Sequence, residues 1–143
     1  MDSLLREDIR HLGLEERARL VGQQPDPLSL HHALDCLVHP QIATEAFPSV
    51  ILEAHACGRP VIASQLDGIP EAWAIGGLGH LVSAGHPEEL ARAMILQAES
   101  PAPSATEQFE AHSRIQAQAS LPVQATRMGN LYRRLMAGRR ELR

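Results

Sequence analysis

The run TEAFPSVILEAHACGRPVIAS, from Thr44 to Ser64, decides the fold of this chain. It reads as a loop, a helix, a tight turn and a strand. Pro48 suits the first helical position, because its φ is fixed and an N–H there has no intrahelical partner. Gly58 is a natural end for the helix, because glycine adopts the left-handed conformation freely. Residues 60–63 are then predicted to be a short strand, and their apolar character is typical of a buried parallel sheet.

Two carboxylates lie in this unit, Glu45 in the loop and Glu53 about one turn inside the helix. Both are expected to face the crevice at the carboxyl end of the sheet, where α/β proteins bind ligands. The backbone N–H groups at the helix start offer a site for an anion. Carboxylates that bind hydroxyl groups, beside a helix end that binds phosphate, suit a nucleotide sugar. The alternative interpretation is an ordinary helix–strand unit with two solvated glutamates.

The same run resembles the signature of family 4 of the retaining glycosyltransferases, which have the GT-B fold. The family pattern is Glu, seven residues, Glu, then Ala-x-Ala-x-Gly-x-Pro-Val-Ile-Ala. This chain meets the pattern with Glu45, Glu53, Ala54, Ala56, Gly58, Pro60, Val61, Ile62 and Ala63. The resemblance covers nearly the whole chain and is most specific from Cys36 to Val82. It implies the C-terminal, donor-binding domain of such an enzyme.

The resemblance also implies roles for individual residues. Glu45 is the candidate catalytic residue and would hold hydroxyl groups of the donor sugar, while Glu53 would hold the ribose hydroxyls. The implied donor-binding set is Glu45, Ala46, Phe47, Pro48, Ser49 and Glu53, with backbone amides around Phe47 and Ser49 near the sugar and the diphosphate. The helix dipole would stabilise the charge that grows on the leaving diphosphate. Gly22 and Gln23 would lie near the nucleobase.

Other features of the sequence bear on this resemblance. Pro48 stands where many members of the family have glycine, so one possible N–H donor is missing. Asp67 replaces the first glycine of the family's Gly-Gly-x-Pro-Glu run, which puts a close backbone approach there in doubt. The family commonly needs no bound metal, so neither a metal nor a cofactor is expected. The expected small-molecule partner is a nucleoside diphosphate sugar.

The predicted fold is α/β, a Rossmann-like parallel sheet with helices on both faces, ending in two helices. The predicted strands are 18–22, 36–39, 60–63 and 79–82. Helices are predicted at 2–12, 25–35, 71–75, 87–97, 106–119 and 123–137. Residues 1–100 would form a partial donor-binding domain, and residues 101–143 a linker and C-terminal helices that pack on it. The apolar stripe of the last helix, Met128, Leu131, Tyr132 and Leu135, is interpreted as core packing.

A doubly wound sheet commonly has the strand order 3-2-1-4-5-6. By resemblance the four predicted strands are the third to the sixth, so the two central strands would lie before Met1. An acceptor-binding N-terminal domain and an early Arg/Lys pair would be missing with them. We therefore expect a fragment, a split-gene product or one subunit of a two-chain enzyme, inactive alone. It would need the missing half or self-associate, unless strands 18–22 and 36–39 close up on each other.

Composition excludes several other classes of protein. The chain has 143 residues with 44% hydrophobic side chains and a net charge of −4, so there is no basic footprint for nucleic acid. No apolar run is long enough to span a membrane. The N-terminus is too charged for a signal peptide, and Cys36 and Cys57 read as small core residues, so a cytoplasmic location is expected. The paired histidines His31 and His32 are interpreted as surface residues on a helix, and the strand-end His39 as structural.

Two further interpretations remain beside the donor-binding half of a glycosyltransferase. The first is a non-catalytic fragment or binding subunit of a split, two-chain glycosyltransferase. The second is a dinucleotide-binding Rossmann module, which is weakly supported because no Gly-x-Gly-x-x-Gly follows a strand. Whether the chain is itself an enzyme therefore stays open at this point.

Overall fold

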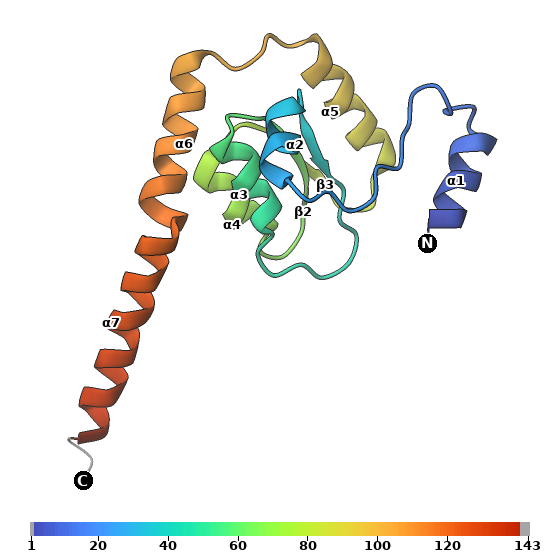
Figure 1. The fold of residues 1–143 in the computed structure, drawn as a ribbon. Coiled ribbons are helices and arrows are strands. Elements are labelled where there is room, and N and C mark those ends of the chain that lie inside the picture. Colours follow the sequence, from blue (N-terminus) through green and yellow to red (C-terminus); the bar gives the residue numbers. More distant parts are fainter. Residues whose placement is uncertain (1, 141–143) are drawn as a thin grey trace.

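The structure of the protein is a computed structural model that describes residues 2–140 (Figure 1). Three strands alternate with helices along the central part of the chain. In order, the elements are α1 (Asp2–His11), α2 (Pro27–Ala33), β1 (Leu37–His39), α3 (Ser49–Ala56), β2 (Val61–Gln65), α4 (Ile69–Gly76), β3 (Gly79–Ser83), α5 (Pro87–Glu99), α6 (Ala105–Ala119) and α7 (Leu121–Arg140). The six predicted helices are all present, with shifted ends, and α3 matches the helix of the central run.

The three strands form one parallel sheet in the order β1-β2-β3. In its register Leu37 lies opposite Val61 and Val61 lies opposite Gly79. Each crossover passes through a helix, as parallel neighbours require. The predicted α/β class and the strands at 36–39, 60–63 and 79–82 are confirmed.

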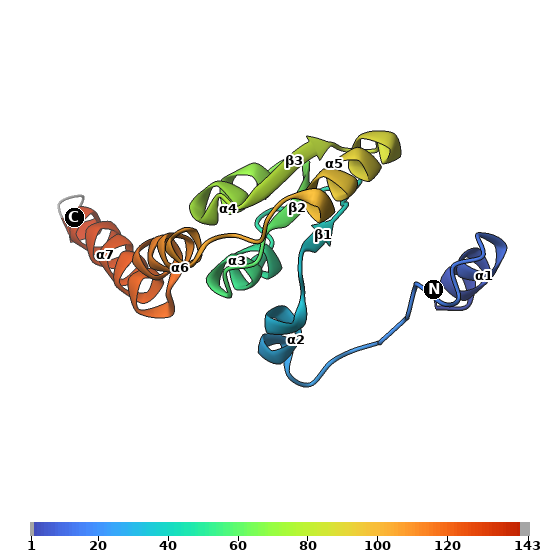
Figure 2. The same ribbon diagram turned by 90° about the horizontal axis from the view of Figure 1, so that it is seen from above.

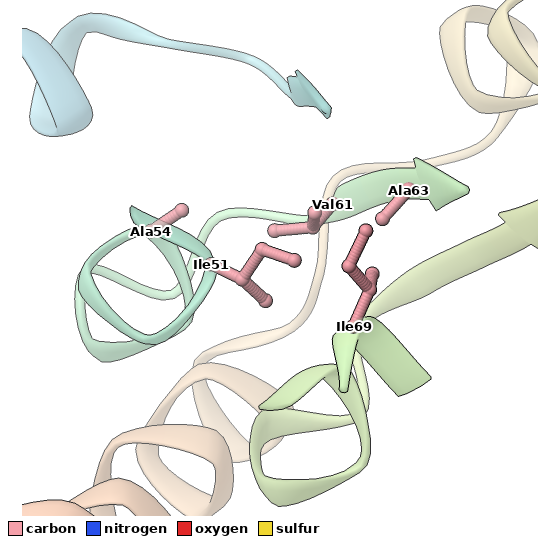
Figure 3. Packing of buried hydrophobic residues seen from close by; sticks show 5 residues of the cluster. All are labelled: Ile51, Ala54, Val61, Ala63 and Ile69. Carbon is pink, nitrogen blue, oxygen red and sulfur yellow. The ribbon is translucent and has the colours of Figure 1, made fainter. Parts of the chain in front are cut away.

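Alternate residues of β2 point to opposite faces of the sheet, as strand geometry requires. Val61 and Ala63 pack against α3 and α4 on one face, in a buried cluster of Ile51, Ala54, Val61, Ala63 and Ile69 (Figure 3). Helix α5 covers the other face of the sheet (Figure 2). There Ile62 lines an apolar hollow together with Met94 of α5. Each buried isoleucine stabilises the fold by about 1.5–3 kcal/mol relative to an exposed one. The sheet therefore has helices on both faces, as predicted.

Side chains of helix α6 form hydrogen bonds with the carboxyl-terminal ends of α3 and α4. Its own start is a capping box, in which Ser104 and Glu107 satisfy each other's backbone N–H groups. His112 Nδ1 donates to the carbonyl of Ala56 at 2.9 Å, and Arg114 donates to the carbonyls of Ile75 at 3.1 Å and Gly76 at 2.5 Å. The last carbonyls of a helix have no intrahelical partner. Side chains of α6 therefore complete both helices and hold them side by side.

The prediction of a strand at 18–22 is wrong, because this segment is irregular and leads from α1 to α2. A parallel strand needs a hydrogen-bonded neighbour, and among residues 2–140 the sheet contains only β1, β2 and β3. Val21 is 61% exposed. The four-stranded alternative, in which this segment pairs with β1, is excluded for the same reason. Helix α1 lies apart from the sheet (Figures 1 and 2).

The stripe of the last helix does not pack in the core of this chain. Met128, Leu131, Tyr132 and Leu135 are between 49% and 60% exposed. Helix α7 continues away from the sheet beyond α6 (Figure 1). The helical spacing correctly predicted an apolar side, but the described residues provide nothing to cover it. The interpretation as core packing is therefore wrong for residues 2–140.

Both cysteines are half-buried free thiols. Burial raises the pKa of Cys36 and of Cys57, so both thiols are protonated and unreactive near neutral pH. They fill space at the edge of the core, close to their predicted role. No helix among the described residues is both long and apolar enough to cross a membrane.

Candidate functional site

The loop that carries Glu45 lies over the turn between β2 and α4. The backbone N–H of Gly68 donates to the carbonyl of Glu45 at 3.3 Å. A Cβ added to Gly68 would lie 1.6 Å from the carbonyl oxygen of Ala46, so the two backbones touch. This contact fixes Glu45, which is half-buried, at the carboxyl end of the sheet. The close backbone approach that Asp67 put in doubt is thus present, one residue later, at Gly68.

Asp67 itself adopts a backbone conformation that usually belongs to glycine. Its φ is +45°, which makes it the one residue other than glycine with a positive φ in the described part of the chain. Aspartate tolerates this region better than most residues, because its short polar side chain bonds locally. The replacement of the family's glycine therefore leaves the turn intact.

The start of α3 presents its backbone amides toward the same loop. Pro48 is buried and occupies the N-cap position with φ −74°, and the helix begins at Ser49. The prediction that Pro48 opens the helix is therefore wrong by one residue. No side chain caps this end. The first N–H groups of a helix have no intrahelical partner, and together with the helix dipole they attract anions. Ala46, Phe47 and Ser49 are exposed around this end.

Glu53 lies one turn further along α3 and contacts His31, which the sequence analysis had interpreted as a surface residue. Its Oε2 lies 3.3 Å from Nε2 of His31 on α2. The Glu53 side chain is 48% exposed, whereas His31 is only 4% exposed. The interpretation of His31 as a surface residue is wrong, while its neighbour His32 is exposed as predicted. The paired histidines gave no signal for this difference, because it depends on the packing of α2 against α3.

The remaining predicted positions lie as follows. Gly22 and Gln23 are exposed in the irregular segment between α1 and α2, and the structure records no hydrogen bond from either to the described residues around Glu45 and Glu53. His39 ends β1 half-buried, and its Nε2 is buried without a hydrogen-bond partner among residues 2–140. No group of three or more His, Cys, Asp or Glu side chains in the described residues could hold a metal ion.

The Glu45 loop, the start of α3 and Glu53 thus lie on an α/β unit whose parallel sheet has helices on both faces. Residues 1–99 match the family model described as glycosyl transferases group 1. Because this match covers more than half of the chain, the protein belongs to that family. Its fold is the Rossmann-like fold of GT-B glycosyltransferases.

Curated relatives are similar to more than half of this chain. The chain is 39% identical over 85 residues to a phosphatidyl-myo-inositol mannosyltransferase of Mycobacterium leprae, which is 58% of this chain and 23% of that protein. It is 36% identical over 85 residues to a D-inositol 3-phosphate glycosyltransferase of Corynebacterium glutamicum, which is 58% of this chain and 20% of that protein. The match thus spans about a fifth of the length of these relatives.

Solved structures agree with this family. HepE of Anabaena, in a crystal structure with UDP, matches with a TM-score of 0.75 and 28% identity over 91% of this chain and 36% of HepE. Sucrose-phosphate synthase of Thermosynechococcus elongatus matches with a TM-score of 0.77 and 33% identity over 94% of this chain and 34% of the synthase. The chain therefore spans about a third of the length of these structures.

Proposed function

We propose that the chain is the nucleotide-sugar-binding half of a glycosyltransferase that transfers a sugar with retention at the anomeric carbon. One observation carries the proposal: the backbone N–H of Gly68 anchors the Glu45 loop beside the uncapped start of α3, the helix that also carries Glu53. In α/β proteins the crevice at the carboxyl ends of the strands is where ligands bind. The crystal structures of HepE with UDP and with UDP-glucose, at 28% identity, support a nucleoside diphosphate sugar as ligand.

In this proposal each part of the crevice binds one part of the donor. Glu45 binds hydroxyl groups of the sugar, and Glu53 binds the hydroxyls of the ribose. The amides around Phe47 and Ser49 face the sugar and the diphosphate, where the helix dipole stabilises the charge on the leaving group. This contribution is electrostatic and needs no general base among these residues. Gly22 and Gln23 remain proposed for the nucleobase side.

We expect the 143-residue chain to transfer no sugar by itself. It spans about a third of the length of the solved glycosyltransferases it matches, and the proposed site holds a donor but no acceptor. The measurement is a transfer assay of the purified chain with a panel of nucleotide sugars and acceptors. Turnover by this chain alone would refute the expectation. Turnover that begins only when an acceptor-binding polypeptide is added would support a donor-binding half.

A second candidate is a non-catalytic binding subunit of a two-chain glycosyltransferase. The observation in its favour is the exposed apolar side of α7, because large apolar patches on monomers are uncommon and mark interaction surfaces. The missing half or a second copy of the chain would cover it. Donor binding without transfer, even in the presence of the acceptor-binding polypeptide, would favour this candidate.

The ribose contact can be tested with Glu53→Gln. This change keeps the shape of the side chain and a carbonyl that can still accept from His31, but it removes the charge. Hydrogen bonds to charged groups are worth about 1.5–3 kcal/mol, so binding of UDP should weaken about tenfold or more. Calorimetry with UDP and its 2′,3′-dideoxy analogue measures the effect.

The control is Glu88→Gln, which removes an exposed carboxylate in the first turn of α5. It should leave both affinities unchanged. A loss for UDP that is matched by an equal loss for the dideoxy analogue would mean that Glu53 supports the fold and does not bind ribose.

A further inference from the structure

We propose that His31 is a positioning residue that fixes one carboxylate oxygen of Glu53, so that the other oxygen is directed at a ligand hydroxyl. The inference rests on the proposed function, because it concerns the same ribose contact. The two residues lie 22 positions apart, on α2 and α3, and meet at 3.3 Å between Nε2 and Oε2. His31 thus acts through Glu53 and not on the ligand.

The chemistry of the pair determines which nitrogen donates. A carboxylate accepts hydrogen bonds but has none to give, so Nε2 of His31 must carry the proton. The other nitrogen, Nδ1, is buried and has no partner among the described residues. In the neutral ring this nitrogen is an acceptor, so no N–H is left unpaired. The N–H at Nε2 of His31, a residue that is 4% exposed, is therefore used on Glu53.

The contact with His31 leaves the Glu53 side chain partly exposed to solvent. Its side chain is 48% exposed while one of its oxygens is held from the protein side. An exposed glutamate otherwise samples several rotamers, and ordering such a side chain on binding has an entropic cost. A contact that fixes the carboxylate in advance removes part of this cost.

Helix α2 is capped at its start and tied to another segment at its end, and both contacts support the position of His31. At its start Asp26 accepts from the N–H of Ser29 at 3.2 Å. At its end Arg59 Nη2 donates to the carbonyl of His32 at 2.9 Å and ties the helix to the turn before β2. Supporting residues that are themselves fixed hold a binding group in one geometry.

The test compares two substitutions of His31 in the full chain. His31→Gln places an N–H₂ near the position of Nε2, whereas His31→Leu keeps apolar bulk and removes the donor. Binding of UDP and of 2′,3′-dideoxy-UDP is measured by calorimetry, and thermal melting checks the fold. We expect His31→Leu to weaken UDP about tenfold and to leave the dideoxy analogue unchanged. His31→Gln should restore most of the affinity for UDP.

His32→Leu is the matched control, because His32 is exposed on the same helix and only its carbonyl is used. It should change neither affinity. If His31→Leu does not fold, His31→Asn replaces it, because its shorter amide cannot reach Glu53. An equal loss for both ligands, or no loss for UDP, would overturn the role of His31. If wild-type chain binds neither ligand, or binds both equally, the proposed ribose contact fails and this inference falls with it.

Discussion

Replacing Gly68 by alanine is expected to weaken UDP binding at least about tenfold and to lower stability by about 1–3 kcal/mol. The new Cβ would lie 1.6 Å from the carbonyl oxygen of Ala46 and 2.7 Å from its carbonyl carbon. Both atoms belong to the backbone, so no side chain can turn aside to make room. The loop must move by more than an ångström, and Glu45 and Phe47 move with it.

The φ of Gly68 is −83°, outside the left-handed region that alanine rarely adopts, so the expected loss comes mainly from the contact. Thermal melting and calorimetry with UDP measure the two effects on one sample. Gly129→Ala is the control. Outside the local helix backbone and the adjacent residues, the atom nearest to its new Cβ belongs to the Arg133 side chain and would lie 3.8 Å away. A Gly68→Ala chain that melts and binds UDP as the wild type does would show that the Glu45 loop is not anchored at this turn.

The central unit could be predicted because its signals are local. A proline, a helical apolar face, a glycine and an apolar strand follow one another within 21 residues, from Thr44 to Ser64. The structure keeps this order as α3, a turn at Gly58 with φ +69°, and β2. The same run also predicted that Glu45 lies in the loop before this helix and that Glu53 lies on the helix itself. The placement of the Glu45 loop, by contrast, depends on Gly68, which lies 23 residues further along the chain.

The predictions that were wrong concern segments whose structure depends on contacts with residues far away in the sequence. A local sequence pattern does not reveal such contacts. Residues 18–22 have the composition of a strand, but a strand exists only beside a neighbour that bonds to it. Helical spacing in α7 predicted an apolar side and could not say whether anything covers it. His31 could not be placed, because its burial results from the meeting of α2 with α3. Contacts between distant segments decide all three cases.

Two glycine-to-alanine substitutions with opposite expected effects on stability test whether contacts between distant segments outweigh local helix propensity. On helix propensity alone, glycine to alanine within a helix should stabilise by about 1 kcal/mol. We expect this gain for Gly129→Ala in α7, where the space around the new Cβ is open. For Gly76→Ala, at the end of α4, we expect instead a loss of about 1–3 kcal/mol or more, because the space is already filled.

The atoms that fill it belong to His55 of α3. A Cβ on Gly76 would lie 2.2 Å from Nδ1, 2.3 Å from Cγ and 2.4 Å from Cβ of this histidine. The ring cannot swing away, because it is fully buried, its Nε2 donates to the carbonyl of Leu78 at 2.9 Å, and Trp73 packs edge-on against it. Burial lowers the pKa of His55, which keeps the ring neutral in this site.

Urea unfolding of wild type, Gly76→Ala, Gly129→Ala, His55→Ala and the double variant His55→Ala/Gly76→Ala measures these effects. Removing the ring should make room for the new methyl group, so the double variant should lose less stability than the sum of its single changes. This coupling would identify the clash between α3 and α4 as the cause. If Gly76→Ala stabilises the chain as Gly129→Ala does, then the two helices do not approach each other as closely as the contact between Gly76 and His55 requires.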